Sequence, residues 1–105
     1  MVVVNVVVLA GTVATEPLKR ELPSGDEVVE LRLSVPEAGK RLLPLPVAVW
    51  PKTLGKRALN GIGKGDEVLV YGQLARRFYR NGAGARSVME VVATGIKKLE
   101  RPETE

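Results

Sequence analysis

After its first residue, the segment Val28–Val35 alternates strictly between apolar and polar side chains. The apolar residues fall on one side of the segment and the polar residues on the other, namely Val29, Leu31, Leu33 and Val35 against Glu30, Arg32 and Ser34. A period of two is that of a β-strand, because successive strand side chains point to opposite faces, whereas a helix repeats every ~3.6 residues. The segment is therefore predicted to be a strand with one face in a core and the other in solvent.

Strand signals dominate the rest of the chain as well. They occur at Val2–Ala10, Leu18–Leu22, Leu42–Trp50, Val68–Arg80 and Ser87–Ile96. Turn-forming residues fill Pro23–Asp26 and the loop Asn81–Ala85, which is the predicted tip of a long hairpin. The plausible helix is Thr53–Ile62, with Thr53 as its N-cap. This order predicts an all-β fold, a five-stranded Greek-key OB barrel with one short helix before strand four.

Two prolines stand near the start of the Leu42–Trp50 strand, at Pro44 and Pro46. Proline has no N–H to donate to a ladder of hydrogen bonds, so it is confined to edges and bulges of sheets. The start of this strand is therefore predicted to lie at an edge or a bulge.

The chain contains no cysteine and no histidine. This composition removes disulfides, thiolate chemistry, the usual zinc sites and proton transfer by imidazole, so no enzymatic activity, metal or cofactor is expected. The net charge of +4 and the pI near 9.7 favour acidic partners such as nucleic acid. No apolar run reaches the roughly 18 residues of a spanning helix, so we expect no membrane association. The absence of cysteine fits a reducing compartment, so we expect a cytoplasmic protein.

The stretch YGQLARRFYRN, Tyr71–Asn81, holds three of the chain's four aromatic residues, interleaved with arginines. Alternation along the strand predicts Phe78 on the core side and places Arg77 and Tyr79 together on the exposed side. An exposed ring beside a guanidinium can stack a nucleobase and contact a phosphate in one place. Tyr79 is therefore predicted to be a base-stacking residue.

Trp50, the single tryptophan, is the second predicted stacking residue because it shares a strand face with prolines and an alanine. Cationic residues group around the two predicted rings, and we predict that they contact phosphates: Arg32, Lys52, Lys56, Arg57, Arg76, Arg77, Arg80 and Arg86. Nothing in the sequence provides a set of donors placed for base edges, so binding is predicted to tolerate any base sequence.

Several segments, in this order and spacing, resemble the bacterial single-stranded DNA-binding protein family. They are NVVVLAGTVATEP from Asn5, PSG at Pro23–Gly25, PVAVWPKTLGKRA from Pro46, KGDEVLVYGQL from Lys64, ARRFY from Ala75 and SVMEVVATGIKKL from Ser87. The resemblance implies an OB barrel that coats exposed single-stranded DNA in replication, repair or recombination, associated with the bacterial nucleoid. It also implies base stacking by Trp50, where the family usually has phenylalanine, and by Tyr79, where it often has tryptophan.

The sequence also departs from the family's pattern. Pro44 stands near one further tryptophan position, the short loop Pro36–Arg41 has lost another, and the chain ends without the family's acidic, phenylalanine-capped tip. A short or divergent paralogue is therefore expected. We predict an OB-fold nucleic-acid-binding domain over residues 1–98 and a charged tail over residues 99–105.

The apolar N-terminal strand predicts self-association, because a bare apolar edge invites pairing with another chain. The predicted interface residues of a homodimer or homotetramer are Val2, Val4, Val6 and Val8. Two other functions stay open. One is an OB-fold interaction module similar to the primosomal accessory proteins, which contacts replication or repair proteins. The other is an RNA-binding OB domain, since stacking and phosphate contacts do not read the sugar.

Overall fold

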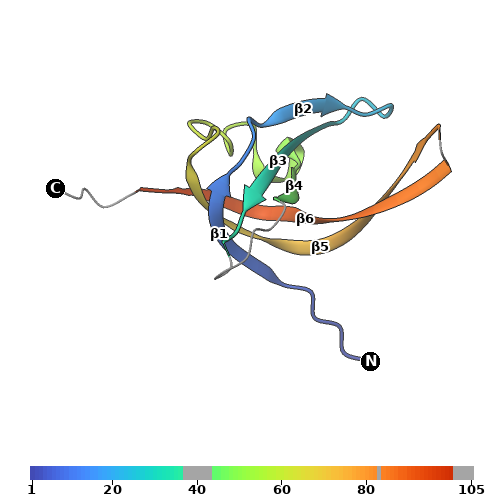
Figure 1. Ribbon diagram of the computed structural model, residues 1–105, viewed down its shortest axis with the longest axis horizontal. Coiled ribbons are helices and arrows are strands. Elements are labelled where there is room, and N and C mark those ends of the chain that lie inside the picture. Colours follow the sequence, from blue (N-terminus) through green and yellow to red (C-terminus); the bar gives the residue numbers. More distant parts are fainter. Residues whose placement is uncertain (37–43, 83, 101–105) are drawn as a thin grey trace.

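A computed structural model describes residues 1–36, 44–82 and 84–100, apart from the side chains of Tyr79 and Asn81. The elements are β1 (Val7–Val13), β2 (Leu18–Glu21), β3 (Glu27–Ser34), β4 (Leu45–Val49), α1 (Pro51–Leu54), β5 (Glu67–Asn81) and β6 (Gly84–Leu99) (Figure 1). The predicted loop Pro36–Arg41, after its first residue, and the end of the predicted tail, residues 101–105, lie outside the described residues.

Five of the strands close into a ring. The hydrogen-bonded order is β1-β5-β6-β4-β3, and β1 also pairs with β3 through Thr12 opposite Ser34 and Val13 opposite Leu33. The pairs are antiparallel except that between β4 and β6. β2 extends the sheet beyond the ring by pairing with β3. The predicted five-stranded OB-type barrel is confirmed, with α1 before the fourth strand of the ring, β5.

The core fills the inside of this ring with aliphatic side chains. Its buried members are Val13, Val29, Leu31, Leu33, Val47, Val49, Val68, Val70, Val91 and Ala93. Leu31 and Leu33 come from the alternating segment that predicted β3, and they are 1% and 0% exposed. Each buried aliphatic side chain of this size contributes about 1.5–3 kcal/mol by leaving water. The alternation therefore identified the inner face of β3 correctly.

The start of β4 lies at an edge, as its prolines predict. Leu45 and Pro46 pair with β3, whereas the pairing of β4 with β6 begins only at Val47. Pro46 therefore needs no N–H on the side that faces β6.

The largest differences from the predicted boundaries concern the helix and the first strand. The helix is confined to α1 because Pro51 occupies its first turn and Gly55, with φ of 96°, ends it; Thr53 lies inside it and is not the N-cap. The first strand begins at Val7 instead of Val2. Just before it, the Asn5 side chain donates to the Leu74 carbonyl and accepts from the Leu74 N–H, both at 2.8 Å. The Asn5 side chain thus makes the two hydrogen bonds to Leu74 that the backbone of a longer β1 would make.

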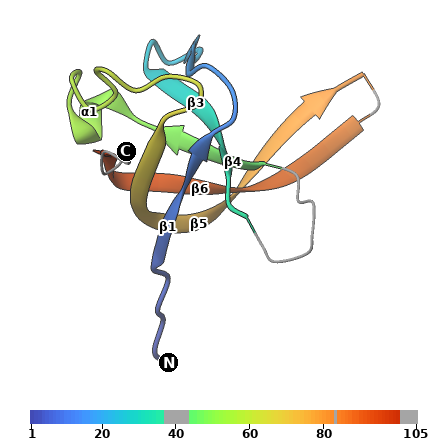
Figure 2. The ribbon, with the colours of Figure 1, turned by 60° about the vertical axis from the view of Figure 1, so that its left-hand side comes forward.

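β5 and β6 form a hairpin that is longer than the barrel is tall. They contain 15 and 16 residues, whereas β4 contains 5, so the outer part of the hairpin projects beyond the ring (Figure 1). α1 lies at the opposite end of the molecule from the hairpin tip (Figure 2). The prediction that Phe78 belongs to the core is wrong, because its side chain is 72% exposed. Val68 and Val70, on the same face of β5, are buried by the ring, which no longer covers that face at Phe78.

Candidate nucleic-acid interface

A groove runs between the outer face of the β2–β3–β4 sheet and the projecting β5–β6 hairpin. It has a volume of ≈ 370 Å³ and is lined by Thr15, Glu16, Leu18, Glu30, Leu31, Arg32, Pro46, Arg77 and Val88. We call it the strand groove. The register between β3 and β4 explains part of the groove's shape. Glu30 lies opposite Ala48, and Arg32 lies opposite Pro46. The shorter side chains on β4 therefore leave room beside the longer ones on β3.

Two arginines in and beside the strand groove are paired with carboxylates. The guanidinium of Arg77 lies 3.4 Å from Glu90 and 3.6 Å from Glu30, and Arg20 lies 2.5 Å from the same Glu30 oxygen. Glu90 is only 8% exposed, and a buried carboxylate needs such a partner. Two positive and two negative charges cancel here, so this cluster does not by itself attract a polyanion.

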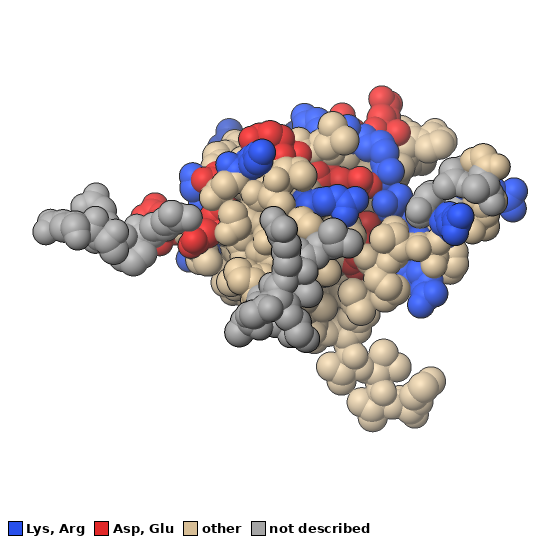
Figure 3. All heavy atoms as spheres, in the orientation of Figure 1, with Lys and Arg blue, Asp and Glu red and all other residues tan. Residues whose placement is uncertain are grey.

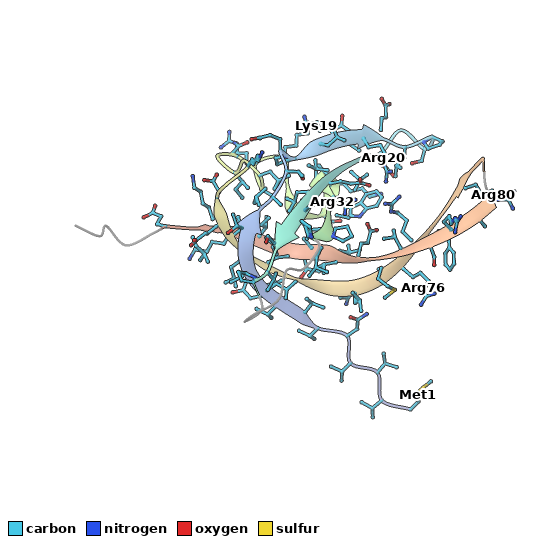
Figure 4. The ribbon with its side chains drawn as sticks, in the orientation of Figure 1. Met1, Lys19, Arg20, Arg32, Arg76 and Arg80 are labelled. Carbon is cyan, nitrogen blue, oxygen red and sulfur yellow. The ribbon has the colours of Figure 1, made fainter. Side chains whose placement is uncertain are left out.

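Arg32 supplies positive charge that is not cancelled in the strand groove. Its side chain is exposed, and it forms no ion pair with any residue that the structure describes. Figure 4 shows Arg20 and Arg32 on the side of the molecule where β2 and β3 face the hairpin. On the surface, acidic and basic groups lie side by side over β3, and further basic groups follow along the hairpin (Figure 3).

Trp50 lies at the end of β4, half-buried, close to the β2–β3 turn. The Lys52 ammonium is 6.0 Å from the centre of its ring and forms an ion pair with Asp26 at 3.1 Å. Continuing the alternation of β4 puts Trp50 on the same outer face as Pro46 and Ala48. The indole thus lies on the outer face of the sheet, beside Lys52, with part of its surface open.

The hairpin divides the predicted arginines between its two faces. Residues that are opposite each other on paired strands share a face. Arg77 is opposite Val88, and both line the strand groove. Two residues farther along, Tyr79 is opposite Arg86, so Arg86 lies on the same face of the hairpin. Arg76 and Arg80 lie on the other face, opposite Met89 and Ala85. Where the Tyr79 ring lies is outside the described part of the structure.

The other predicted cations lie away from the strand groove. Lys56 lines a separate hollow of ≈ 710 Å³ between β2 and the segment after α1, together with Lys19, Glu16 and Glu27. Arg57 follows in the same segment and is exposed. The structure therefore brings together Arg32 and Arg77 in the strand groove and places Arg86 farther out on the same hairpin face. It places Trp50 and Lys52 at the other end of β3, by Asp26, and Lys56 and Arg57 in a separate segment.

Sequence reasoning missed several residues of this region. Glu30 and Glu90 hold the arginines, Leu18 lines the strand groove and is 67% exposed, and Phe78 stands open on the far face of the hairpin. For Phe78, the length of the strand was an available signal. A strand of 15 residues is longer than a small barrel is tall, so the side chains at its outer end cannot reach the core.

No group of three or more potential metal ligands occurs within residues 1–36, 44–82 and 84–100. In the same ranges, the single helix is far too short to span a bilayer.

Residues 4–99 match the profile of the Single-strand binding protein family, which leaves only the first few and last few residues unmatched. A comparison with curated proteins gave no match.

Proposed function

This chain belongs to the single-strand binding protein family, and we propose that it binds single-stranded DNA without reading its sequence and without catalysing a reaction. The family match over almost the whole chain is the observation that carries this proposal. The position of the strand groove supports it, because OB-fold proteins bind nucleic acids on the face formed by their central strands and the flanking loops.

The proposed mechanism combines stacking with exchange of ion pairs. Trp50 stacks a base near the β2–β3 turn, and Arg32 contacts a phosphate in the strand groove. Arg77 joins when a phosphate oxygen replaces one of its two carboxylate partners. Arg86 and the ring of Tyr79 extend the path along the hairpin. One barrel would cover on the order of 4–16 nucleotides.

We further propose that the physiological targets are the strands exposed in replication, repair or recombination. Self-association as a homodimer or homotetramer belongs to the same proposal. Its support is the exposure of the N-terminal valines Val2, Val4, Val6 and Val8, because soluble proteins rarely leave a large apolar patch uncovered.

A fluorescence titration tests the proposed binding. Trp50 is the single tryptophan, so quenching of its emission by oligo-dT reports directly on stacking at this position. The observed affinity should fall as salt rises, with a slope near −0.7 in log–log form for each phosphate neutralised. Competition with RNA and with duplex DNA of the same length separates DNA binding from RNA binding. Absence of oligo-dT binding at low salt would reject the proposal.

A further inference from the structure

The far face of the β5–β6 hairpin carries an exposed aromatic residue between two arginines. It is formed by Leu74, Arg76, Phe78 and Arg80 of β5 and by Ala85, Ser87 and Met89 of β6. We call it the outer hairpin face. Phe78 is 72% exposed, and Leu74 and Met89 are 46% and 43% exposed. So large an open ring has no role in the core.

The arrangement of these side chains follows from the strand period. Arg76, Phe78 and Arg80 are two residues apart, so they form one row with a spacing of about 7 Å. Phe78 lies opposite Ser87, a small residue that leaves the ring uncovered from the neighbouring strand. The row therefore presents one ring with a cation on each side of it.

The charge of the outer hairpin face differs from that of the strand groove. In the groove Arg77 and Arg20 are held by Glu30 and Glu90. On the outer hairpin face there is no acidic residue among its seven members, and no described carboxylate pairs with Arg76 or Arg80. Figure 4 shows Arg76 on the side of the hairpin away from Arg20 and Arg32. These cations are free to meet an external anion.

We propose that the outer hairpin face is a second contact surface for single-stranded nucleic acid, in which Phe78 stacks a base and Arg76 and Arg80 contact the flanking phosphates. The inference rests on the proposed function and extends the path of the strand beyond the groove. The hairpin is a single two-stranded ribbon, so a strand that leaves the groove reaches the second face by passing around its edge. The excess of positive charge favours a polyanion over an apolar protein surface.

Oligonucleotides of two lengths distinguish the two surfaces. Anisotropy titrations of the full chain would use labelled oligo-dT of roughly 8 nucleotides, which fits one barrel, and of roughly 30 nucleotides, which exceeds it. We expect Phe78→Ala to weaken binding of the long oligonucleotide by about fivefold or more, the lower end of one base–aromatic stack, and to leave the short one unchanged. Arg76→Gln should reduce the salt slope for the long oligonucleotide by about 0.7.

Two matched variants separate stacking from simple apolar contact. Phe78→Trp keeps an aromatic ring and should preserve the affinity for the long oligonucleotide, whereas Phe78→Leu keeps an apolar side chain and should lose it. Lys64→Gln, an exposed charge removed from the turn before β5, controls for net charge and should have a smaller effect than Arg76→Gln.

The outcomes are distinct. Unchanged binding of the long oligonucleotide by Phe78→Ala, with Trp50 still quenched, overturns this inference and leaves the proposed function standing. A shift in sedimentation of Phe78→Ala with unchanged DNA binding also overturns it and assigns the face to a second copy of the chain. Failure of the unaltered chain to bind either oligonucleotide overturns both proposals.

Discussion

The guanidinium of Arg77 on β5 lies 3.6 Å from the carboxylate of Glu30 on β3, so an ion pair crosses the strand groove between two strands that are not neighbours in the sheet. Glu30 also holds Arg20, and Arg77 also reaches Glu90. A carboxylate and a phosphate offer an arginine similar oxygen acceptors. In the proposed mode of binding, the acidic residues occupy the positions that phosphates would take, so binding would compete with ion pairs inside the protein.

The first prediction concerns this competition. Glu30→Gln removes the carboxylate that holds Arg20 and one of those that hold Arg77. Arg20 should then be available to a phosphate, and Arg77, which stays paired with Glu90, should exchange its partner for a phosphate more easily. We expect the affinity for oligo-dT at low salt to rise about three- to tenfold, with a steeper dependence on salt, because more phosphates are neutralised. The measurement is a titration at several salt concentrations.

Glu27→Gln is the matched control for that variant. It makes the same change of net charge on the same strand, but Glu27 is exposed and lines the separate hollow instead of the strand groove. If both variants raised the affinity equally, the effect would be one of overall charge and the competition argument would be wrong.

The second prediction concerns stability. Arg77→Gln leaves the carboxylate of Glu90, 8% exposed, without its charged partner, so the variant should unfold about 1–2 kcal/mol more easily. The double variant Arg77→Gln with Glu90→Gln should recover most of this loss, because a neutral amide has no charge to bury. Urea unfolding followed by circular dichroism measures both. Arg32→Gln, at an exposed residue, should stay within about 0.5 kcal/mol of the unaltered chain.

The strands could be predicted from the sequence because their signal is local. Alternation at Leu31 and Leu33 depends only on which face of one strand meets the core. The order of the strand segments along the chain, with one short helix before the fourth, then predicted the barrel. The prolines of β4 gave an equally local signal for an edge.

The candidate site could be predicted only in part because its features depend on where strands end and meet. Phe78 has the same alternation as the buried Val70, and only the height of the ring shows that one is covered and the other open. The pairing of Arg77 with Glu30 joins residues far apart in the chain, and no sequence period reports it. The sequence therefore predicted Arg77 as a phosphate contact without showing its ion pairs with Glu30 and Glu90.

The third prediction concerns Gly72, at the irregularity in the pairing of β5 with β6. Gly72 lies where the register with β6 shifts, and a Cβ atom placed there would be 2.3 Å from the Val92 carbonyl oxygen. That neighbour is backbone and cannot move aside, so Gly72→Ala should destabilise the fold by about 3 kcal/mol or more. Gly82→Ala is the control, since a Cβ there meets nothing within 4 Å. Urea unfolding of the two variants should differ clearly, and equal midpoints would contradict the steric argument.

The last prediction concerns self-association through the N-terminal segment. Val6 and Val8 are 74% and 55% exposed in the isolated chain, so the unaltered protein should sediment as a dimer or larger species at micromolar concentration, with this edge covered. Val6→Lys combined with Val8→Lys should lower the sedimenting mass to that of one chain while the circular dichroism spectrum is kept, because neither side chain belongs to the core and an interface that buries unpaired charge is strongly disfavoured. Leu18→Lys, an equally exposed apolar residue in the strand groove, should leave the mass unchanged. A monomer for the unaltered protein would contradict the proposal, and a lower mass for Leu18→Lys would move the interface to the groove.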